Sequence, residues 1–374
     1  MGRLVVVHAA RSRGRLMDAR LWHEQARTET LAAPTPKTIA QLRAMSTSSR
    51  TRYLSHRRRW MRSLHFDTPA TRQARQALTD LVEDNLTSMP GAKDVIAVTA
   101  PFAVGKSTLV RTWAQEQYRQ IIEDRVHHSQ VPTWNSNVGV VADEVPVVWL
   151  DLGAASKIRA FNIQFLQYFG YPIGGAIHDL TARIHRIVDA HRVRLLIVDD
   201  TNLLNLRHKD ARDVLDHLKH VNTVLGQRGA SMVLVGADLE DGAIFQDPQM
   251  AGRLRAIRLG PCSIDTPTGV AAWQETLASI ENLVLPYLPA ARPGILAGHH
   301  APRLWRLTQG YLGDLARLIA EAAYIAARED TWTIRIADLE RPQLSRRAQH
   351  ATPRLRETRA VKTTKPATAE AHAP

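Results

Sequence analysis

The sequence contains one cysteine, Cys262, among its 374 residues. A single thiol excludes a disulfide framework and a cysteine-based zinc site within the chain. Long apolar runs are also missing, because the longest, such as Leu4–Val7 and Leu195–Val198, are far shorter than the roughly 20 residues that cross a bilayer. Residues 1–20 contain five arginines and no clear cleavage site, which argues against a secretory signal. We therefore expect a cytoplasmic protein that does not insert into membranes.

Acidic residues are scarce at both ends of the chain. Residues 1–75 contain 16 Lys and Arg but only 4 Asp and Glu, and residues 341–374 contain 8 against 2. Since the whole chain has a formal charge of +13, the central residues 76–340 carry a net −5. Basic flanks beside a mildly acidic centre are typical of chains whose flanks neutralise a polyanion such as duplex DNA. The alternative is that the flanks are solvated tails that aid solubility.

Composition divides the chain into five parts. Residues 1–40 have no sustained period and predict an irregular basic arm, whereas residues 41–92 predict a basic helical segment. Residues 93–262 alternate short apolar runs with amphipathic helices, which predicts an α/β core with a parallel five-stranded sheet flanked by helices. Residues 263–345 predict a smaller α-helical domain. Residues 346–374 are rich in Ala, Thr, Pro and basic residues and predict a disordered basic tail.

One loop carries the clearest chemical signal. The run TAPFAVGKST, residues 99–108, follows a strand-like segment and opens a helix, which is the setting of a phosphate-binding loop. Lys106 is expected to pair with the β- and γ-phosphates of ATP, and the Ser107 hydroxyl to hold Mg²⁺. The first glycine of the usual motif is Ala100 here, which constrains the turn. The residues expected to bind the nucleotide are Ala103, Val104, Gly105, Lys106, Ser107 and Thr108.

Two aspartates end the apolar run Leu195–Val198. Asp199 is expected to orient Mg²⁺. Asp200 comes where ATPases with a phosphate-binding loop of this general kind usually carry a glutamate that polarises the attacking water. Aspartate is one methylene shorter, so its carboxylate falls about an ångström short of the ideal position. Slow hydrolysis is therefore expected. The alternative for Asp200 is that it caps the next helix.

The order of these motifs resembles that of AAA+ ATPases, and in particular the TniB/TnsC group of transposition regulators. The resemblance covers about residues 40–340. The segments that carry it are the phosphate-binding loop, the aspartates after the third strand, Val235–Asp238, Gln249–Leu254, the arginine-rich Tyr53–Trp60 and the lid segment Gly310–Ile319.

What the resemblance implies for the site can be placed on single residues. Asp238 lies in the region that senses the γ-phosphate, or else it holds Lys106 or an arginine. Arg253 or Arg255 is the arginine that reaches the ATP of a neighbouring subunit, unless both are ordinary surface residues before an edge strand. Ala316 stands where many AAA+ lids have an arginine that contacts the nucleotide, and the adjacent Arg317 takes that role only with a shifted helix register.

The resemblance also implies duplex DNA as a partner. ATP bound between subunits would build a ring or a helical filament on the duplex, which would recruit or activate a transposase together with a target-selection protein. Lys157 and Arg159 are expected to face DNA by this resemblance, or else to form an ordinary solvated helix start. The arginines Arg57, Arg58 and Arg59 are expected to bind DNA or to pack against the next subunit.

Two other functions stay open at this point. One is a STAND-like or defence-system signalling ATPase, which would require an effector domain. The other is a DNA-binding scaffold whose nucleotide site does not turn over, an alternative that both Ala100 and Asp200 support. A phosphate-release assay separates this scaffold from an ATPase.

Overall fold

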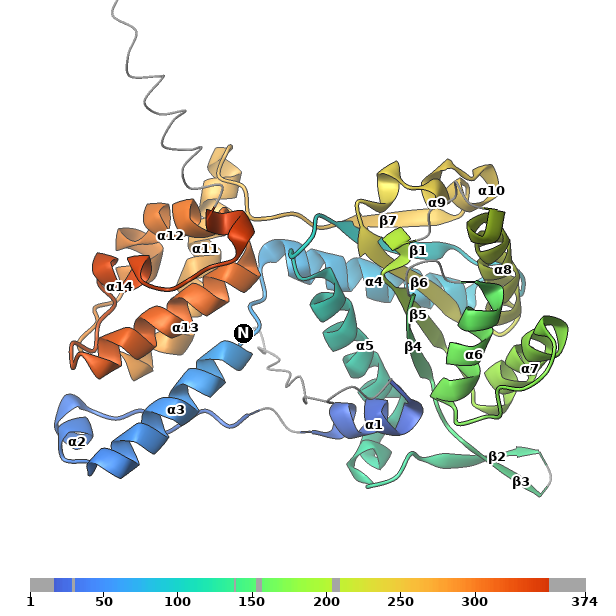
Figure 1. The fold of residues 1–374 in the computed structure, drawn as a ribbon, viewed down its shortest axis with the longest axis horizontal. Coiled ribbons are helices and arrows are strands. Elements are labelled where there is room, and N and C mark those ends of the chain that lie inside the picture. The colour runs from blue at the N-terminus through green and yellow to red at the C-terminus, as the bar shows by residue number, and fades with distance from the viewer. Residues whose placement is uncertain (1–16, 29–30, 138, 153–156, 204–208, 350–374) are drawn as a thin grey trace, which may run out of the picture. The chain divides into compact units, whose positions relative to one another are not determined.

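The computed structural model describes residues 17–28, 31–137, 139–152, 157–203 and 209–349. Nearly all of the predicted tail and the first 16 residues of the predicted arm lie outside these ranges. The chain divides into two compact units (Figure 1). Unit 1 comprises Met1–Ala32 and Asp67–Gly260, and unit 2 comprises Ala33–Phe66 and Pro261–Pro374. Among the described residues, no helix is both long enough and apolar enough to span a bilayer.

Unit 1 is built on a five-stranded sheet in the order β4-β5-β6-β1-β7, and every neighbouring pair is parallel. The strands are β1 (Val95–Ala100), β4 (Val147–Asp151), β5 (Leu195–Asp199), β6 (Ser231–Ala237) and β7 (Leu254–Arg258). This confirms the predicted parallel five-stranded sheet. Strands β1, β5 and β6 are buried along their whole length, which explains their uninterrupted apolar sequences. The carboxyl ends of parallel strands meet at one edge, and the loops at that edge carry the candidate site.

Helices cover both faces of this sheet (Figure 1). Helices α1, α4 and α5 pack together on one face, and α6, α7 and α8 on the other. The bounds are α1 (Ala19–Arg27), α4 (Pro69–Thr87), α5 (Lys106–Ile122), α6 (Ile158–Tyr168), α7 (Ile177–Ala190), α8 (Lys209–Gly226), α9 (Ala243–Gln246) and α10 (Pro248–Ala251). Thr68 caps α4 by accepting from the Thr71 N–H at 3.1 Å, and Pro69 opens the helix.

Two elements of unit 1 differ from the sequence prediction. The stretch expected to be irregular contains α1, because Trp22 is fully buried and its ring stacks 5.9 Å from that of Trp149. His23 fixes α1 further, with Nδ1 2.8 Å from the Tyr118 hydroxyl and Nε2 2.8 Å from the His128 carbonyl oxygen. Between α5 and β4 the chain forms an antiparallel hairpin of β2 (Thr133–Asn137) and β3 (Val140–Asp143).

Unit 2 is helical among its described residues. Its helices are α2 (Ile39–Arg43), α3 (Thr47–Ser63), α11 (Pro267–Val284), α12 (Ala301–Thr308), α13 (Leu312–Arg328) and α14 (Ile336–Glu340), with a π-helical turn at Ile295–His299. Helix α3 packs against α13, although 248 residues of sequence lie between Ser63 and Leu312. Leu42, Leu54, Ala327 and Trp332 form the apolar cluster of this contact. The predicted helical segment 41–92 is thus shared between the two units, since α3 belongs to unit 2 and α4 to unit 1.

A buried histidine in unit 1 predicts acid sensitivity of the fold. His217 on α8 is 7% exposed, its Nε2 lies 2.7 Å from Asn162 Oδ1 on α6, and burial lowers its pKa from 6.5 to about 4. Between pH 6.5 and about 4 the unfolded chain binds a proton that the folded chain does not, so stability falls as the pH falls through this window. We expect a loss of about 3 kcal/mol in all, at ~1.4 kcal/mol per unit of pKa.

Denaturant unfolding at a series of pH values between 4.5 and 7 measures this slope. His217→Gln keeps a donor for Asn162 but cannot titrate, so its free energy of unfolding should depend less steeply on pH. An equal pH slope in the variant and the original chain would contradict the assignment.

Candidate nucleotide-binding site

The loop between β1 and α5 forms a turn suited to anions. Ala103 and Gly105 adopt left-handed backbone conformations, with φ of 64° and 104°. Gly105 is the N-cap of α5 and has no side chain that could accept a hydrogen bond from the helix. The first-turn N–H groups therefore point into the loop without a side-chain acceptor. Such N–H groups, together with the helix dipole, favour phosphate at this position. Ala100 is the last residue of β1 and has extended backbone, which an alanine adopts without strain.

Lys106 and Ser107 occupy the first turn of α5. Lys106 is 8% exposed, and its ammonium lies 5.4 Å from the ring centroid of Phe102, a residue of the same loop. Ser107 Oγ donates to Asp199 Oδ1 at 3.2 Å. The structure therefore brings together the two motifs that the sequence separates by more than ninety residues. Of the other predicted loop residues, Val104 is half-buried, and Ala103 and Thr108 are exposed.

Asp199 ends the buried strand β5 and is itself 5% exposed. Its Oδ1 also accepts from the Asp200 N–H at 2.9 Å. Burial raises the pKa of the Asp199 carboxyl, while the hydrogen bonds from Asp200 and Ser107 act in the opposite direction. One hydroxyl and one carboxylate side by side are a donor set that suits Mg²⁺, which prefers oxygen ligands and keeps several waters. In the described part of the chain, no group of three or more His, Cys, Asp and Glu side chains gathers as a metal site.

Polar side chains tie the loops after β1, β5 and β6 to one another. Thr99 Oγ1 accepts from the Leu239 N–H at 3.0 Å, and Asn202 Oδ1 accepts from the Ala237 N–H at 3.1 Å. Thr201 Oγ1 donates to the Val235 carbonyl at 3.0 Å. The sequence prediction missed these three residues. The available signal was that each is a polar residue at or just beyond the end of a buried strand.

The two candidate acids at this edge are both exposed and both strained. Asp200 has φ of 55° and Asp238 has φ of 46°, conformations that non-glycine residues rarely adopt. Strain of this kind often accompanies functional positions. The Lys106 ammonium lies 5.4 Å from the ring centroid of Phe102, and among the described residues it forms no ion pair with Asp238.

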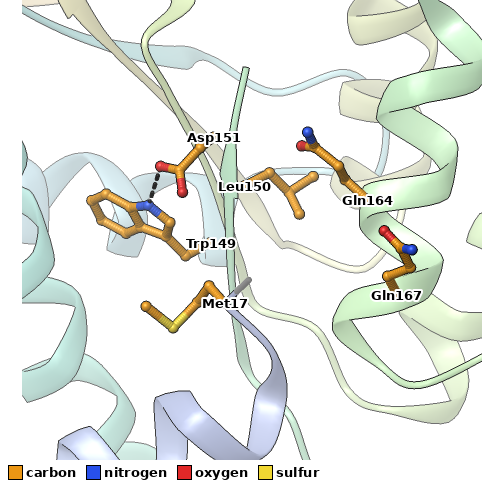
Figure 2. A pocket seen from close by; sticks show the side chains of 6 residues that line it. All are labelled: Met17, Trp149, Leu150, Asp151, Gln164 and Gln167. Atoms are coloured by element: carbon orange, nitrogen blue, oxygen red, sulfur yellow. Dashed lines mark hydrogen bonds between the residues drawn. The ribbon is translucent and has the colours of Figure 1, made fainter. Parts of the chain in front are cut away.

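A small pocket opens beside the end of β4 (Figure 2). Its volume is about 40 Å³, and it is lined by Met17, Trp149, Leu150, Asp151, Gln164 and Gln167. The Trp149 indole N–H donates to Asp151 Oδ1 at 2.9 Å, as the dashed line in Figure 2 marks. The lining includes no residue of the phosphate loop, and the volume is far below the ~300 Å³ of an ordinary ligand site.

The two candidate arginines before the edge strand differ in their surroundings. Arg255 Nε lies 2.8 Å from Asp94 Oδ2 in the same chain, so its charge is already paired. Arg253 is exposed in the turn before β7. Arg317 belongs to unit 2, where it lies on the exposed side of α13.

The predicted DNA-binding arginines fall into different environments. Arg57 is 1% exposed and donates to the carbonyl oxygens of Tyr287 at 2.7 Å and Ala323 at 2.5 Å. The expectation that Arg57 binds DNA is therefore wrong, because its guanidinium is buried and its donors are used inside unit 2. Arg58 forms an ion pair with Glu321 at 2.6 Å, whereas Arg59 is exposed.

The other two DNA candidates begin α6. Lys157 is the exposed N-cap residue of the helix, and its side chain does not cap it. Arg159 is exposed and donates through Nη1 to the Gly175 carbonyl at 2.7 Å, which holds the helix start to the loop before α7.

Comparison with known proteins places the chain in a family. The model of the family described as bacterial TniB protein matches residues 60–263. No curated protein matches the chain. Solved structures that match include the ORC2 protein of Aeropyrum pernix in ADPNP–ADP complexes (14% identity, TM-score 0.49, 78% of this chain and 71% of that chain) and the ORC1 protein of the same organism in complex with DNA (14%, 0.48, 82% and 70%). Domain III of the replication initiation protein DnaA of Thermotoga maritima also matches (14%, 0.43, 74% and 91%).

The family match covers the edge of the sheet that carries the candidate site. It begins within α3, includes the phosphate-binding loop and Asp199, and ends just beyond β7. Because the matched residues make up more than half of the chain, the protein belongs to the TniB family and carries a nucleotide-binding fold of the AAA+ type.

Proposed function

We propose that this TniB-family protein is a cytoplasmic, ATP-dependent, DNA-binding regulator of DNA transposition. It would assemble with itself on duplex DNA in the ATP-bound state and recruit or activate a transposase, with a target-selection protein as a further partner. Hydrolysis would then release the assembly. The observation that carries the proposal is the contact of Ser107 with Asp199 beside Lys106, since it joins a phosphate loop to a metal-orienting carboxylate.

Each residue of the candidate site would have a separate role in ATP binding or hydrolysis. Lys106 and the N–H groups at the start of α5 would bind the β- and γ-phosphates, and Ser107 with Asp199 would hold Mg²⁺. Mg²⁺ supplies neutralisation of the charge that develops on the phosphates. Asp200 would accept the proton of the attacking water, although its short side chain makes this a slow base. ATP then acts as a switch that holds one assembled state rather than as a source of force.

A neighbouring subunit would complete the site. Asp94 neutralises Arg255 within the chain, so the exposed Arg253 is the better candidate for the arginine that stabilises charge on a neighbour's γ-phosphate. The extended backbone of Ala100 removes one of the two arguments for a scaffold that does not turn over ATP, and leaves Asp200 as the other.

Negative-stain imaging of the full chain with duplex DNA tests this proposal. Samples with a non-hydrolysable ATP analogue, with no nucleotide, and with Lys106→Ala would be compared. Rings or filaments that need both DNA and nucleotide, and that are absent in the variant, are expected. Isolated particles under every condition, despite normal nucleotide binding, would contradict the proposal. A parallel phosphate-release assay would separate an ATPase from a non-hydrolysing scaffold.

A further inference from the structure

Helix α3 has an unusual charge composition. Its sequence, TSSRTRYLSHRRRWMRS, contains six arginines and no acidic residue. Arginines this dense repel one another unless they are separated or neutralised. The structure shows which of them are neutralised and which are not.

The arginines on one side of α3 hold the helix in unit 2. Arg50 forms an ion pair with Asp330 at 2.9 Å, and Arg57 donates to two carbonyl oxygens. The guanidinium carbons of both lie over the ring of Trp332, at 5.5 and 5.4 Å from its centroid. Arg57 is therefore buried inside the fold, whereas Arg50 is partly exposed but has its charge paired with Asp330.

The opposite side of α3 is exposed and carries three of the other four arginines, while Arg58 is half-buried and pairs with Glu321. The residues of this exposed side recur every three or four positions, which places them along one stripe of an α-helix. The stripe, which we name the α3 arginine face, consists of Ser48, Arg52, Ser55, Arg59 and Arg62. Among the described residues, the side chains of Arg52 and Arg59 form no ion pair or hydrogen bond, and Arg62 has only a long contact of 3.7 Å with Glu321.

The neighbouring helix α13 extends this positive surface. Arg50 reaches Asp330 while Arg58 reaches Glu321, so the two helices run antiparallel, as Figure 1 shows. Arg317 is exposed one helical turn before Glu321, which places it beyond the Arg62 end of the α3 arginine face. Glu321 forms ion pairs with both Arg58 and Arg62, so one negative charge is shared between two arginines. The surface therefore stays strongly positive.

The dimensions and chemistry of this face favour a phosphate backbone. Arg52 to Arg62 spans ten residues, or about 15 Å at ~1.5 Å per residue. Duplex DNA presents one phosphate charge per about 1.7 Å of its axis, so several phosphates lie within that length. Serine hydroxyls between the arginines are further donors for phosphate oxygens. The face has no apolar residue to anchor a protein partner in a desolvated pocket, which argues against an acidic protein surface.

We propose that the α3 arginine face binds the phosphodiester backbone of duplex DNA, with Arg317 at its end. This inference rests on the proposed DNA-binding function and assigns it a surface. Contacts of this kind recognise charge and spacing and carry little sequence preference. The inference also assigns Arg317 to the DNA backbone, in place of the contact with bound ATP that the resemblance to AAA+ ATPases implied.

Fluorescence anisotropy of the full chain with a labelled 30-bp duplex tests the assignment, over a series of salt concentrations. The double variant Arg52→Gln/Arg59→Gln should bind about 10-fold or more weakly at low salt. The slope of log K against log salt should fall by about 2, because each arginine that neutralises a phosphate contributes close to one. Arg52→Lys/Arg59→Lys should keep most of the affinity, since it keeps both charges.

A control of equal charge comes from unit 1. Arg186→Gln/Arg212→Gln removes two exposed arginines from α7 and α8 and should leave the salt slope unchanged. Thermal melting of each variant shows whether the fold is intact.

Tight binding by the original chain with an unchanged slope in the Arg52/Arg59 variant would overturn this inference and leave the proposed function standing. Absence of duplex binding in the original chain would overturn both. Loss of self-association with unchanged DNA binding would assign the face to protein contact and overturn the inference.

Discussion

Replacement of Lys106 by alanine should reduce ATP turnover roughly 100-fold or more, which is the usual cost of removing one preorganised charge from a transition state. Lys106 is nearly buried at the start of α5, beside a loop whose N–H groups turn toward the phosphate position. No other lysine belongs to this loop, so no neighbour replaces its charge. Steady-state phosphate release in the presence of Mg²⁺ measures the effect.

A matched substitution distinguishes this effect from the loss of any lysine. Lys219 on α8 pairs with Asp216 at 2.9 Å and with Asp247 at 2.8 Å, away from the phosphate loop. Lys219→Ala should therefore leave turnover unchanged. Asp199→Asn keeps an oxygen for the Ser107 hydroxyl but removes the negative charge, so it should abolish activation by Mg²⁺. Full turnover in Lys106→Ala would show that this loop is not the catalytic site.

Gly226→Ala should destabilise unit 1 by about 3 kcal/mol, toward the upper end of what overpacking costs. Gly226 is the last residue of α8, where alanine is otherwise the better helix former. A Cβ at this position would overlap the Gly91 carbonyl oxygen and would lie 2.8 Å from Lys93 Cγ. The loop between α4 and β1 would have to move. Denaturant unfolding measures the change in free energy.

The control is the same substitution in a helix with free space. Gly313 lies in the first turn of α13, and a Cβ there meets nothing within 4 Å. Gly313→Ala should therefore stabilise its unit, by up to ~1 kcal/mol from helix propensity. The two substitutions are chemically identical, so opposite signs report the close approach of backbones at Gly226. A stable Gly226→Ala variant would show that the loop at Gly91 is not held there.

Sequence reasoning predicted the sheet, which the structure confirms, and placed the candidate phosphate loop after a strand and before a helix, because both depend on local patterns. Strand β5 begins at Leu195, the first residue of the apolar run that the sequence shows, since a strand covered on both faces needs an uninterrupted apolar run. Asp199 follows such a run directly, which is why its position was predictable. Whether an alanine fits at position 100 was not predictable, because the answer depends on the backbone conformation of that residue. The structure shows that the backbone of Ala100 is extended.

The rest depended on contacts between distant parts of the chain. The arginine density of α3 is visible in the sequence, but only the position of α13 decides that Arg57 is buried and Arg59 exposed. Strand β2 has the sequence TWNSN, which shows no apolar alternation and therefore gave no strand signal. Helix α1 is held in place because the ring of Trp22 stacks on that of Trp149, a residue more than 120 positions away in the sequence. Long-range packing of this kind overrides local propensity.

The path of the chain through the two units sets an order of events during synthesis. Unit 1 is complete once Gly260 has been made, so the phosphate loop can fold while the ribosome is still adding residues. Helix α3 is made early, but α13 follows about 250 residues later, a delay of roughly 12 to 50 s at ~5–20 residues per second. Throughout that interval Leu54 lacks Ala327 of α13, with which it packs in the folded unit. A nascent chain stalled before Leu312 would therefore hold a folded nucleotide domain and an exposed apolar helix face, which is the kind of surface that chaperones bind.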